Sequence, residues 1–559
     1  MKKINFSLLL TILLIQSSMA QITVWNSSKL NKNIISSQWE VNDILYTVNE
    51  NITNPFSESI FAIVKEEQEE QRIPLFYNDN NQWVFRYSSS RIGKKKYILE
   101  SSIKELNGKK GKITITENKK KERHGGIVKK ENDPRHFYYE DGSHYFNLAF
   151  ECDWLFALDY GQKEIPKTEH LLGLINKNGF NQVVMNVYAY DPDLDWVKDK
   201  RLKENPQHDY GAREDIFPFL GSNSEPDYSA LNIDFFKHFD KVIAEMHNKE
   251  IVSHLMIYVW NKRVAWPEAG SKADNMYYDH IIKRYQAFPN IIWDVSKEAT
   301  NKIAVSQNKN IVQHIEERIT RTRKLDAYNR LLSVHAYSFC KNHKDDVDFI
   351  STQDWKLSLH QSMMNVYKLF PDKPVFNIEH GGYEKSPYSV FPGGYESPEE
   401  CLRRNYMCLF AGVYTTYYWQ AASWNAIIHN PFEQNDDFIK PNFAYFKHMR
   451  KLFNQVNYEN FKPVTKYNPR SYTLVNNKEG VLMQYFPKEV HSDDIKRHLD
   501  TEFNYENATK KWFNTITGEF TKEVKLEFKH KYGFWDYRPW RNKADAILII
   551  KNITPKTNK

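Results

Sequence analysis

Cysteine is scarce in this sequence, and its spacing excludes two common roles. The four cysteines among 559 residues are Cys152, Cys340, Cys401 and Cys408. They form no CxxC or CxxxH pattern, so zinc is not indicated, and we expect no metal and no cofactor. Cys401 and Cys408 lie seven residues apart in a segment with helical patterning. This spacing puts them on one helix face and predicts burial in the core rather than a disulfide framework.

Three further patterns are absent. Beyond the first twenty residues, no segment approaches the roughly 18 apolar residues that span a bilayer, so we expect no membrane span. No glycine-rich phosphate loop follows an early strand, which disfavours a doubly wound nucleotide-binding sheet. No G-x-S-x-G motif occurs, which disfavours a Ser/His/Asp triad.

A strong charge imbalance is also lacking. The net charge is +7, and lysine runs such as Lys94–Lys96 and Lys119–Lys121 resemble solvated faces more than a binding surface. We therefore expect no nucleic-acid partner. An acidic or sulfated glycan is permitted by this charge but not required by it. The sequence does not indicate an oligomeric state.

The first twenty residues have the pattern of a cleavable signal peptide. Lys2 and Lys3 precede an apolar run at 8–15, which is followed by Ser-Met-Ala at 18–20. No cysteine follows the run, which disfavours a lipid anchor. We therefore expect an exported chain, either periplasmic or secreted.

The remaining sequence divides into regions that differ in their pattern of apolar and polar residues. A chain of 559 residues favours several domains, at about 100–200 residues each. Short alternating segments between Asn, Gly and Lys clusters fill 21–128 and predict an N-terminal β-sandwich. Residues 129–455 predict a barrel, and 456–559 return to strand-like runs that predict a C-terminal β-domain. The basic, apolar-poor stretch 117–134 is typical of a linker.

The central region alternates short apolar runs with longer amphipathic segments. Eight such runs, separated by helical patterns, are what a (β/α)8 TIM barrel requires. An open doubly wound sheet is the alternative. The runs are Tyr145–Phe150, Gln182–Val187, Ile251–Ile257, Ile291–Val295, Leu331–Val334, Phe349–Thr352, Val375–Ile378 and Gly412–Tyr418.

Two glutamates follow apolar runs in positions that suit catalysis. Glu298 comes shortly after the fourth run, and Glu379 ends the seventh. Active sites of such barrels lie at the carboxyl ends of the strands, and strands 4 and 7 face each other across the mouth. Glycoside hydrolysis needs one carboxylic acid and one opposing carboxylate, about 5–5.5 Å apart in a retaining enzyme. The pair therefore predicts a glycosidase in which both glutamates are catalytic.

Other polar and aromatic residues follow the predicted strands and are candidate substrate-binding residues. Sugar rings stack on aromatic side chains, while amide, imidazole and carboxylate groups bind hydroxyls. For each residue, packing in the core is the alternative. The candidates are Asp153, Trp154, Asn186, Tyr188, Tyr258, Lys297, His335, Tyr337, Gln353, Trp355 and Trp419.

Parts of the barrel region resemble the apiosidase-like barrels of polysaccharide-degrading bacteria. The similar segments are FYYEDGSHYFNLAFECDW at 137–154, Gly179-Phe-Asn181, Ile292–Glu298 and Pro374–Glu379. The resemblance implies a (β/α)8 barrel of the retaining clan, with the acid/base after strand 4 and the nucleophile after strand 7. Glu298 and Glu379 match those two positions.

The resemblance extends to the flanks and includes one departure. The sandwich, with Phe85-Arg-Tyr87 and Arg91-Ile-Gly93, resembles the uncharacterised β-domain that often precedes these barrels. The tail resembles their collagen-binding-like C-terminal domain. Many clan members have asparagine immediately before the acid/base, where it commonly binds the sugar 2-hydroxyl, but this chain has Lys297. That contact is therefore in question, and with it the substrate.

Three other interpretations remain open. A carbohydrate-binding or adhesion protein on a degenerate barrel would suit the abundant aromatics, and Lys297 favours it mildly. A metal site at His380 has no companion ligand at suitable spacing. A polysaccharide lyase would need a Tyr/His or Lys base and a cation for a uronate, which no arrangement indicates. The leading hypothesis is an exported retaining glycosidase that cleaves a polysaccharide or oligosaccharide.

Overall fold

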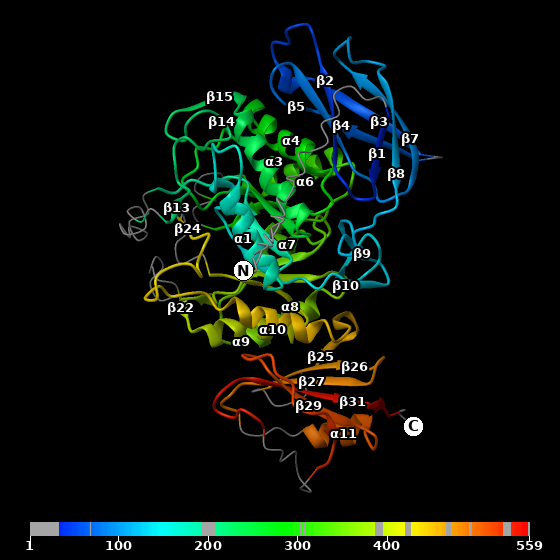
Figure 1. Ribbon diagram of the computed structural model, residues 1–559, viewed down its shortest axis with the longest axis vertical. Helices are drawn as coiled ribbons and strands as arrows, with labels where there is room; N and C mark the ends of the chain where they lie inside the picture. Colours follow the sequence, from blue (N-terminus) through cyan, green and yellow to red (C-terminus); the bar gives the residue numbers. More distant parts are fainter. Residues whose placement is uncertain are drawn as a thin grey trace, which may run out of the picture.

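The computed structural model describes residues 33–66, 69–192, 205, 207–301, 305, 309–385, 395–419, 426–464, 471–490, 495–528 and 538–556. The predicted signal peptide lies outside these residues. Three domains follow one another along the long axis, with the barrel between a sandwich at one end and a β-domain at the other (Figure 1). No helix among the described residues combines the length and apolar character needed to cross a membrane.

The N-terminal domain is a sandwich of a five-stranded sheet and a three-stranded sheet, which enclose a core around Trp83 and Ile113. All strand pairs are antiparallel except β1 with β8, which run parallel. A short helix, η1 (Pro55–Ser57), precedes the third strand. The strands are β1 (Asn33–Ser37), β2 (Asn42–Thr47), β3 (Ile60–Glu66), β4 (Glu69–Pro74), β5 (Phe76–Tyr77), β6 (Gln82–Tyr87), β7 (Gly93–Ser101) and β8 (Lys110–Thr116).

The stretch predicted to be a linker is instead ordered structure. It contains β9 (Ile127–Lys130) and the start of β10 (Asp133–Tyr139), which pair as a hairpin. Phe137 on β10 packs against Phe349 and Tyr414, which lie at the amino ends of two barrel strands. The hairpin therefore covers the bottom of the barrel. The sequence pattern missed it because few of its residues are apolar.

The central domain is a nearly closed barrel of eight parallel strands, which confirms the fold predicted from the apolar runs. Parallel strands are buried on both faces, and this is why each appears as a continuous apolar run. The strands are β11 (Ala149–Glu151), β12 (Gln182–Asn186), β16 (Val252–Val259), β17 (Ile291–Lys297), β18 (Leu332–His335), β19 (Ile350–Gln353), β20 (Val375–Glu379) and β23 (Tyr414–Tyr417).

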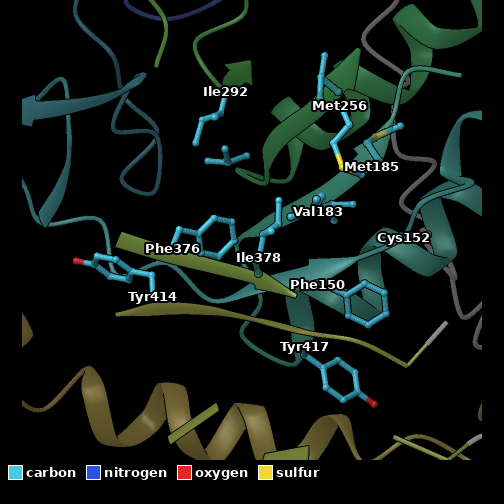
Figure 2. Packing of buried hydrophobic residues seen from close by; sticks show 14 of the residues in the cluster. Phe150, Cys152, Val183, Met185, Met256, Ile292, Phe376, Ile378, Tyr414 and Tyr417 are labelled. Carbon is cyan, nitrogen blue, oxygen red and sulfur yellow. The ribbon is translucent and has the colours of Figure 1, made fainter. Parts of the chain in front are cut away.

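The two end strands of this sheet meet through few hydrogen bonds. The Asp348 N–H donates to the Leu332 carbonyl at 2.8 Å, and Ser333 Oγ donates to the Phe349 carbonyl at 2.8 Å. Apolar side chains from β11, β12, β16, β17, β20 and β23 form the core on both faces of the barrel sheet (Figure 2). Phe376 packs against His254 within the barrel, whereas Phe150 and Tyr417 pack against Phe443 on α10 (Phe443–Phe453). Active sites of such barrels lie at the mouth.

Helices surround the barrel. Helices α3, α4 and α9 begin with Asn232, Ser271 and Ser397, whose side chains accept from backbone N–H groups of the first turn. The helices are α1 (Pro166–Lys177), α3 (Ile233–Asn248), α4 (Lys272–Tyr285), α6 (Ile311–Leu325), α7 (Tyr337–Asn342), α8 (Leu359–Leu369), α9 (Pro398–Leu409) and α10 (Phe443–Phe453), with η2 (Leu155–Ala157) and η4 (Tyr458–Asn460).

Short strand pairs stiffen the loops of the barrel. The pairs are β13 (Asp209–Tyr210) with β24 (Ala426–Ile427), β14 (Phe219–Gly221) with β15 (Pro226–Leu231), and β21 (Tyr383–Glu384) with β22 (Tyr395–Glu396). The first pair joins the loop after the second barrel strand to the loop after the eighth. Distant parts of the mouth are therefore tied together.

The C-terminal domain is a six-stranded antiparallel sheet with one helix and a further strand pair. This agrees with the compact β-domain expected from the sequence. Its elements are β25 (Lys462–Val464), β26 (Tyr472–Asn476), β27 (Val481–Phe486), α11 (Ile495–Glu502), β28 (Phe503–Asn504), β29 (Thr509–Asn514), β30 (Val524–Lys525), β31 (Ala546–Lys551) and β32 (Thr554–Pro555).

Both flanking domains are joined to the barrel by buried contacts. Arg86 of the sandwich bonds to Asp43 and, at 3.0 Å, to Asp240 on α3. On the other side, Arg403 on α9 bonds to Asp545 at 2.9 Å, and Tyr406 packs against Tyr485. These contacts hold both flanks against the outer helices, away from the strand ends.

The cysteines follow the expectation from their spacing. All four are buried and none forms a disulfide, and Cys401 and Cys408 lie on α9 with no measurable exposure. They act as small apolar core residues.

Candidate active site

Glu298 directly follows β17 at the mouth of the barrel. Its φ is 50°, a left-handed conformation that costs of order 1–3 kcal/mol in a residue other than glycine. Its N–H donates to the His335 carbonyl at 2.9 Å, and its Oε2 accepts from Asn301 Nδ2 at 2.7 Å. Strained backbone of this kind is concentrated at functional sites, and here it sets the orientation of the Glu298 carboxylate.

Glu379 ends β20 and is anchored through one oxygen. Its Oε1 accepts from Gln353 Nε2 at 2.9 Å and from the Tyr383 hydroxyl. Its Oε2 lies 4.0 Å from His335 Nε2, which is beyond hydrogen-bond range. The side chain is therefore fixed in orientation while Oε2 remains available.

Lys297 joins opposite sides of the mouth. Its Nζ lies 2.8 Å from Glu151 Oε1 and 2.8 Å from Asp153 Oδ2. All three side chains are buried. Asp153 Oδ2 is also 3.4 Å from the Tyr418 hydroxyl, and the Tyr418 ring packs edge-on against Tyr383. One ammonium group thus connects strand 4, strand 1 and the residue that holds Glu379.

The electrostatics of this cluster follow from burial and from the charge of Lys297 among several carboxylates. Burial raises the pKa of Glu151 well above its ordinary value, and Asp153 and Glu379 raise it further, while Lys297 lowers it. Burial lowers the pKa of Lys297, but Asp153 and Glu151 together raise it well above its usual range. Lys297 is therefore a permanent cation in the site.

The same groups act on Glu379. Burial is the main cause that raises the pKa of Glu379 to about 7, and the charge of Glu298 adds to it. Lys297 and the hydrogen bond from Tyr383 oppose this shift because they stabilise the carboxylate. Glu298 and Glu379 are thus close enough to interact electrically, as a catalytic pair must.

A chain of buried polar groups supports His335 from below. The His335 N–H donates to Asp294 Oδ1 at 2.9 Å, and Asp294 Oδ2 lies 3.2 Å from His254 Nε2. Gln182 Nε2 donates to His254 Nδ1 at 3.1 Å. These residues come from four neighbouring barrel strands. They fix the end of β18, and with it the position of the His335 ring beside Glu379.

A cavity of about 600 Å³ lies between the end of β19 and helix α8, and its lining includes Gln353, which donates to Glu379, but not Glu379 itself. Three predicted residues line it, namely Tyr337, Gln353 and Trp355. The Trp355 ring is partly exposed and packs edge-on against Tyr383. Gly381 makes this possible, because a Cβ at that position, which has φ of 75°, would lie 2.8 Å from the Trp355 ring.

Asn186, His335 and Trp419 offer buried polar atoms at strand ends. Within the described part of the chain, both amide atoms of Asn186, both ring nitrogens of His335 and Trp419 Nε1 have no hydrogen-bond partner. Buried polar groups normally find partners. Unpaired donors and acceptors at the strand ends are therefore suited to substrate hydroxyls.

Three other predicted residues lie in core packing instead. Trp154 is buried beneath Gly211, where an added Cβ would lie 2.9 Å from its ring. Tyr188 packs against Phe217 and other aromatic rings. Tyr258 points to the outer face of its strand, where its hydroxyl donates to Asp274 on α4. Their spacing placed them after strands but did not reveal which face they occupy.

His380 is not positioned to bind a metal. Its Nε2 donates to the Thr416 carbonyl at 2.8 Å, and its Nδ1 accepts from the Gly382 N–H at 3.2 Å. Both nitrogens are therefore occupied. The residue ties the seventh strand to the eighth.

Sequence reasoning missed four residues of the site: Glu151, Asn301, Tyr383 and Tyr418. Glu151 directly follows the first apolar run, the same signal that singled out Glu379, so it could have been found. Tyr383 and Tyr418 resemble the many packed tyrosines of this chain. Only the fold brings them to the glutamates.

We predict that Lys297→Met lowers the free energy of unfolding by about 3–5 kcal/mol, because it leaves buried carboxylates without their cation. Adding Glu151→Gln should recover part of this loss. Urea denaturation of the single and double variants measures the coupling between the two residues.

Lys65→Met serves as the control, since Lys65 and Glu70 form an ion pair with side chains 64% and 54% exposed. Its loss should cost less than about 1 kcal/mol. Equal losses at Lys65 and Lys297, or no coupling between Lys297 and Glu151, would contradict the assigned role.

Comparisons with known proteins agree with this geometry. A protein from Bacteroides vulgatus described as a candidate glycoside hydrolase has a TM-score of 0.69 at 19% identity, covering 94% of this chain and 100% of its own. A glycoside hydrolase family 5 protein from the same species has a TM-score of 0.52 at 17% identity, with coverages of 77% and 93%. Another solved glycoside hydrolase has a TM-score of 0.53 at 17% identity, with coverages of 77% and 97%. These likenesses show a shared fold.

The sequence itself supplies the assignment. No curated protein sequence matches this chain significantly. The family described as apiosidase-like, catalytic domain, matches residues 131–431, which contain both glutamates and all eight barrel strands. Because this match spans more than half of the 559 residues, the chain belongs to the apiosidase-like family and is a glycoside hydrolase.

Proposed function

We propose that this chain is an exported, retaining glycoside hydrolase that cleaves a polysaccharide or oligosaccharide by double displacement. Glu298 acts as acid/base and Glu379 as nucleophile. The observation that carries the proposal is the anchoring of Glu379. Two donors hold its Oε1, while Oε2 lies 4.0 Å from the nearest imidazole nitrogen of His335.

The proposed reaction has two steps. Glu298 donates its proton to the glycosidic oxygen while Glu379 Oε2 attacks the anomeric carbon, so the leaving group departs as an alcohol and a glycosyl ester forms. Glu298, now ionised, takes a proton from water, and the resulting hydroxide attacks the same carbon. The ester bond breaks, Glu379 is regenerated, and the product keeps the anomeric configuration of the substrate.

The hydrogen bonds around Glu379 favour the ionised form that the attack requires. Gln353 and Tyr383 both donate to its carboxylate. Together with the charge of Lys297, these donors oppose the effect of burial on the pKa of Glu379. The carboxylate of Glu298 is oriented by the amide of Asn301, from which it accepts.

The remaining strand-end groups support binding of the reacting sugar. His335 and Asn186 present unpaired polar atoms, and Trp355 presents a partly exposed ring beside Glu379. Hydroxyls can bind the polar atoms and a ring face can stack on the indole. Lys297 is held by Glu151 and Asp153, so we propose that it stabilises the site instead of replacing the asparagine contact to the 2-hydroxyl.

Lys297 no longer argues for a degenerate, purely binding barrel, because its ion pairs give it a place in an intact site. Turnover of any aryl glycoside separates the two interpretations.

Export rests on the signal-like residues 1–20, and we propose a periplasmic or secreted location. We assign stability or binding, not chemistry, to the flanks, since the candidate pair belongs to the barrel.

The first prediction concerns the nucleophile. Glu379→Gln keeps the shape of the side chain but removes the attacking carboxylate, so kcat should fall by several powers of ten for every leaving group. Glu384→Gln is the matched control, because this nearby buried glutamate bonds to Asn442 and Tyr417 instead of facing the mouth. Comparable loss in both variants, measured on an aryl glycoside, would show that Glu379 has no special role.

The second prediction concerns the acid/base. Glu298→Ala removes the proton donor, so turnover of an alkyl glycoside should collapse. A dinitrophenyl glycoside needs no protonation and should still form the glycosyl ester. Azide should then restore turnover by attacking that ester without a base, and the product should be a glycosyl azide of retained configuration. Absence of azide rescue would count against Glu298 as acid/base.

The third prediction concerns pH. Because burial and the charge of Glu298 raise the pKa of Glu379 to about 7, this carboxyl group is protonated below that pH and ionised above it. Only the ionised form can attack the anomeric carbon, so kcat/KM should rise as pH increases through about 7. The rise should occur for a dinitrophenyl glycoside as well as for an alkyl glycoside, because both need the nucleophile. A kcat/KM for the dinitrophenyl glycoside that stays constant as pH crosses about 7 would contradict the assignment of Glu379 as nucleophile.

A further inference from the structure

A second cavity, of about 720 Å³, lies on the outer side of the barrel mouth. It is formed by the loop that follows β16 and by the first turns of α6. Small-molecule sites commonly enclose about 300–1,000 Å³, so this volume can hold a short oligosaccharide segment. Its lining includes Trp260, Trp266, Glu268, His314 and Glu317.

This cavity is separate from the catalytic residues but close to them in the fold. Val259 pairs with Lys297 in the barrel sheet. Trp260 and Glu298, the residues that follow them, therefore lie on neighbouring strand ends. The Trp260 ring stacks on Tyr258, whose hydroxyl bonds to α4 on the outside of the barrel. The cavity therefore adjoins the mouth from outside, and its lining includes neither glutamate.

The inner wall of the cavity offers aromatic faces and unpaired polar atoms. Trp260 is 4% exposed and His314 is 8% exposed. Within the described residues, Trp260 Nε1 and His314 Nε2 have no hydrogen-bond partner, and His314 Nε2 lies 3.8 Å from Asp274 Oδ2. Trp266 adds a partly exposed second indole, with its centroid 6.2 Å from that of Trp260. Stacking surfaces beside ring nitrogens that can bind hydroxyls are what a sugar requires.

The charges at the rim favour a neutral sugar. Glu268 and Glu317 both line the cavity, and its described lining contains no lysine or arginine. Glu317 is already paired with Arg318 and Arg321 on α6, so the carboxylate that a uronate or sulfate group would meet is that of the exposed Glu268. Glucuronate- or sulfate-rich chains are therefore disfavoured at this site, although the net positive charge of the whole chain would permit them.

We propose that this cavity is an accessory glycan-binding site that takes a neutral segment of the polysaccharide, away from the bond being cleaved. The proposal rests on the proposed function, since it treats the occupant as part of the same substrate. It implies that longer neutral chains bind better than single glycosides. The partly exposed indole of Trp266 supplies affinity, and Glu268 supplies selectivity against anionic chains.

The test uses the full chain carrying Glu379→Gln, so that binding is measured without turnover. Native gels containing galactomannan, arabinoxylan or xyloglucan should retard this protein, and a gel containing polygalacturonate should not. Adding Trp266→Ala should weaken the binding by about tenfold or more. Trp266→Phe, which keeps a smaller ring, should bind with intermediate strength. Thermal melts establish that each variant is folded.

Charge reversal supplies an independent arm if the alanine variant does not fold. Glu268→Lys places a cation at the exposed rim and should create retardation by polygalacturonate. Glu316→Lys is the matched control, because Glu316 faces His343 instead of the cavity, and it should create none. No retardation in any neutral gel, unchanged binding of Trp266→Ala, or equal gains in both lysine variants would overturn the proposal.

The outcomes separate this site from the catalytic assignment. If Glu379→Gln keeps full turnover, the proposed nucleophile is wrong, yet the binding assays still report on the cavity. If Glu379→Gln is inactive but Trp266→Ala binds normally, the catalytic assignment stands and the accessory site is wrong.

Discussion

The buried ion pairs of Lys297 are the interaction on which the rest of the mouth depends. Glu151, Asp153 and Glu379 are all buried at strand ends, and such groups repel one another unless a cation is among them. Lys297 provides that cation, with Nζ 2.8 Å from two of the carboxylates. Because it immediately precedes Glu298, it also anchors the residue whose backbone is strained. Glu379, Glu298 and Lys297 are thus parts of one electrostatic unit.

The barrel makes this unit rigid. Apolar side chains pack on both faces of its sheet (Figure 2), and hydrogen bonds connect Gln182 through His254 to Asp294 below the mouth. The flanking domains pack against outer helices and leave the strand ends free (Figure 1). Positioned groups on rigid strands lose little orientation entropy when they act. The fold therefore positions the site, and the loops shape what can enter it.

The pattern of apolar residues along the sequence records some features of this structure and not others. All eight barrel strands were predicted, because strands buried on both faces give uninterrupted apolar runs. The positions of Glu298 and Glu379 followed from strand order alone. Which side of a strand a residue occupies did not, so Tyr188 and Tyr258 were grouped with His335 although they pack outward.

Other features depend on contacts between distant segments, which no local pattern records. Tyr383 reaches Glu379 from β21, and Tyr418 reaches Asp153 from the end of the eighth strand. The β9–β10 hairpin looked like a linker because its order comes from packing under the barrel, at Phe349 and Tyr414. The accessory cavity likewise forms only when the loop after β16 meets α6.

The central claim is that Glu379 forms a covalent bond to the sugar, and mass spectrometry tests it most directly. The Glu298→Ala variant, mixed with a dinitrophenyl glycoside that the unmodified enzyme hydrolyses, should accumulate a protein heavier by one glycosyl unit. Peptide mapping should place that unit on Glu379. A label on another carboxylate, or an unlabelled protein that releases product of inverted configuration, would contradict the account.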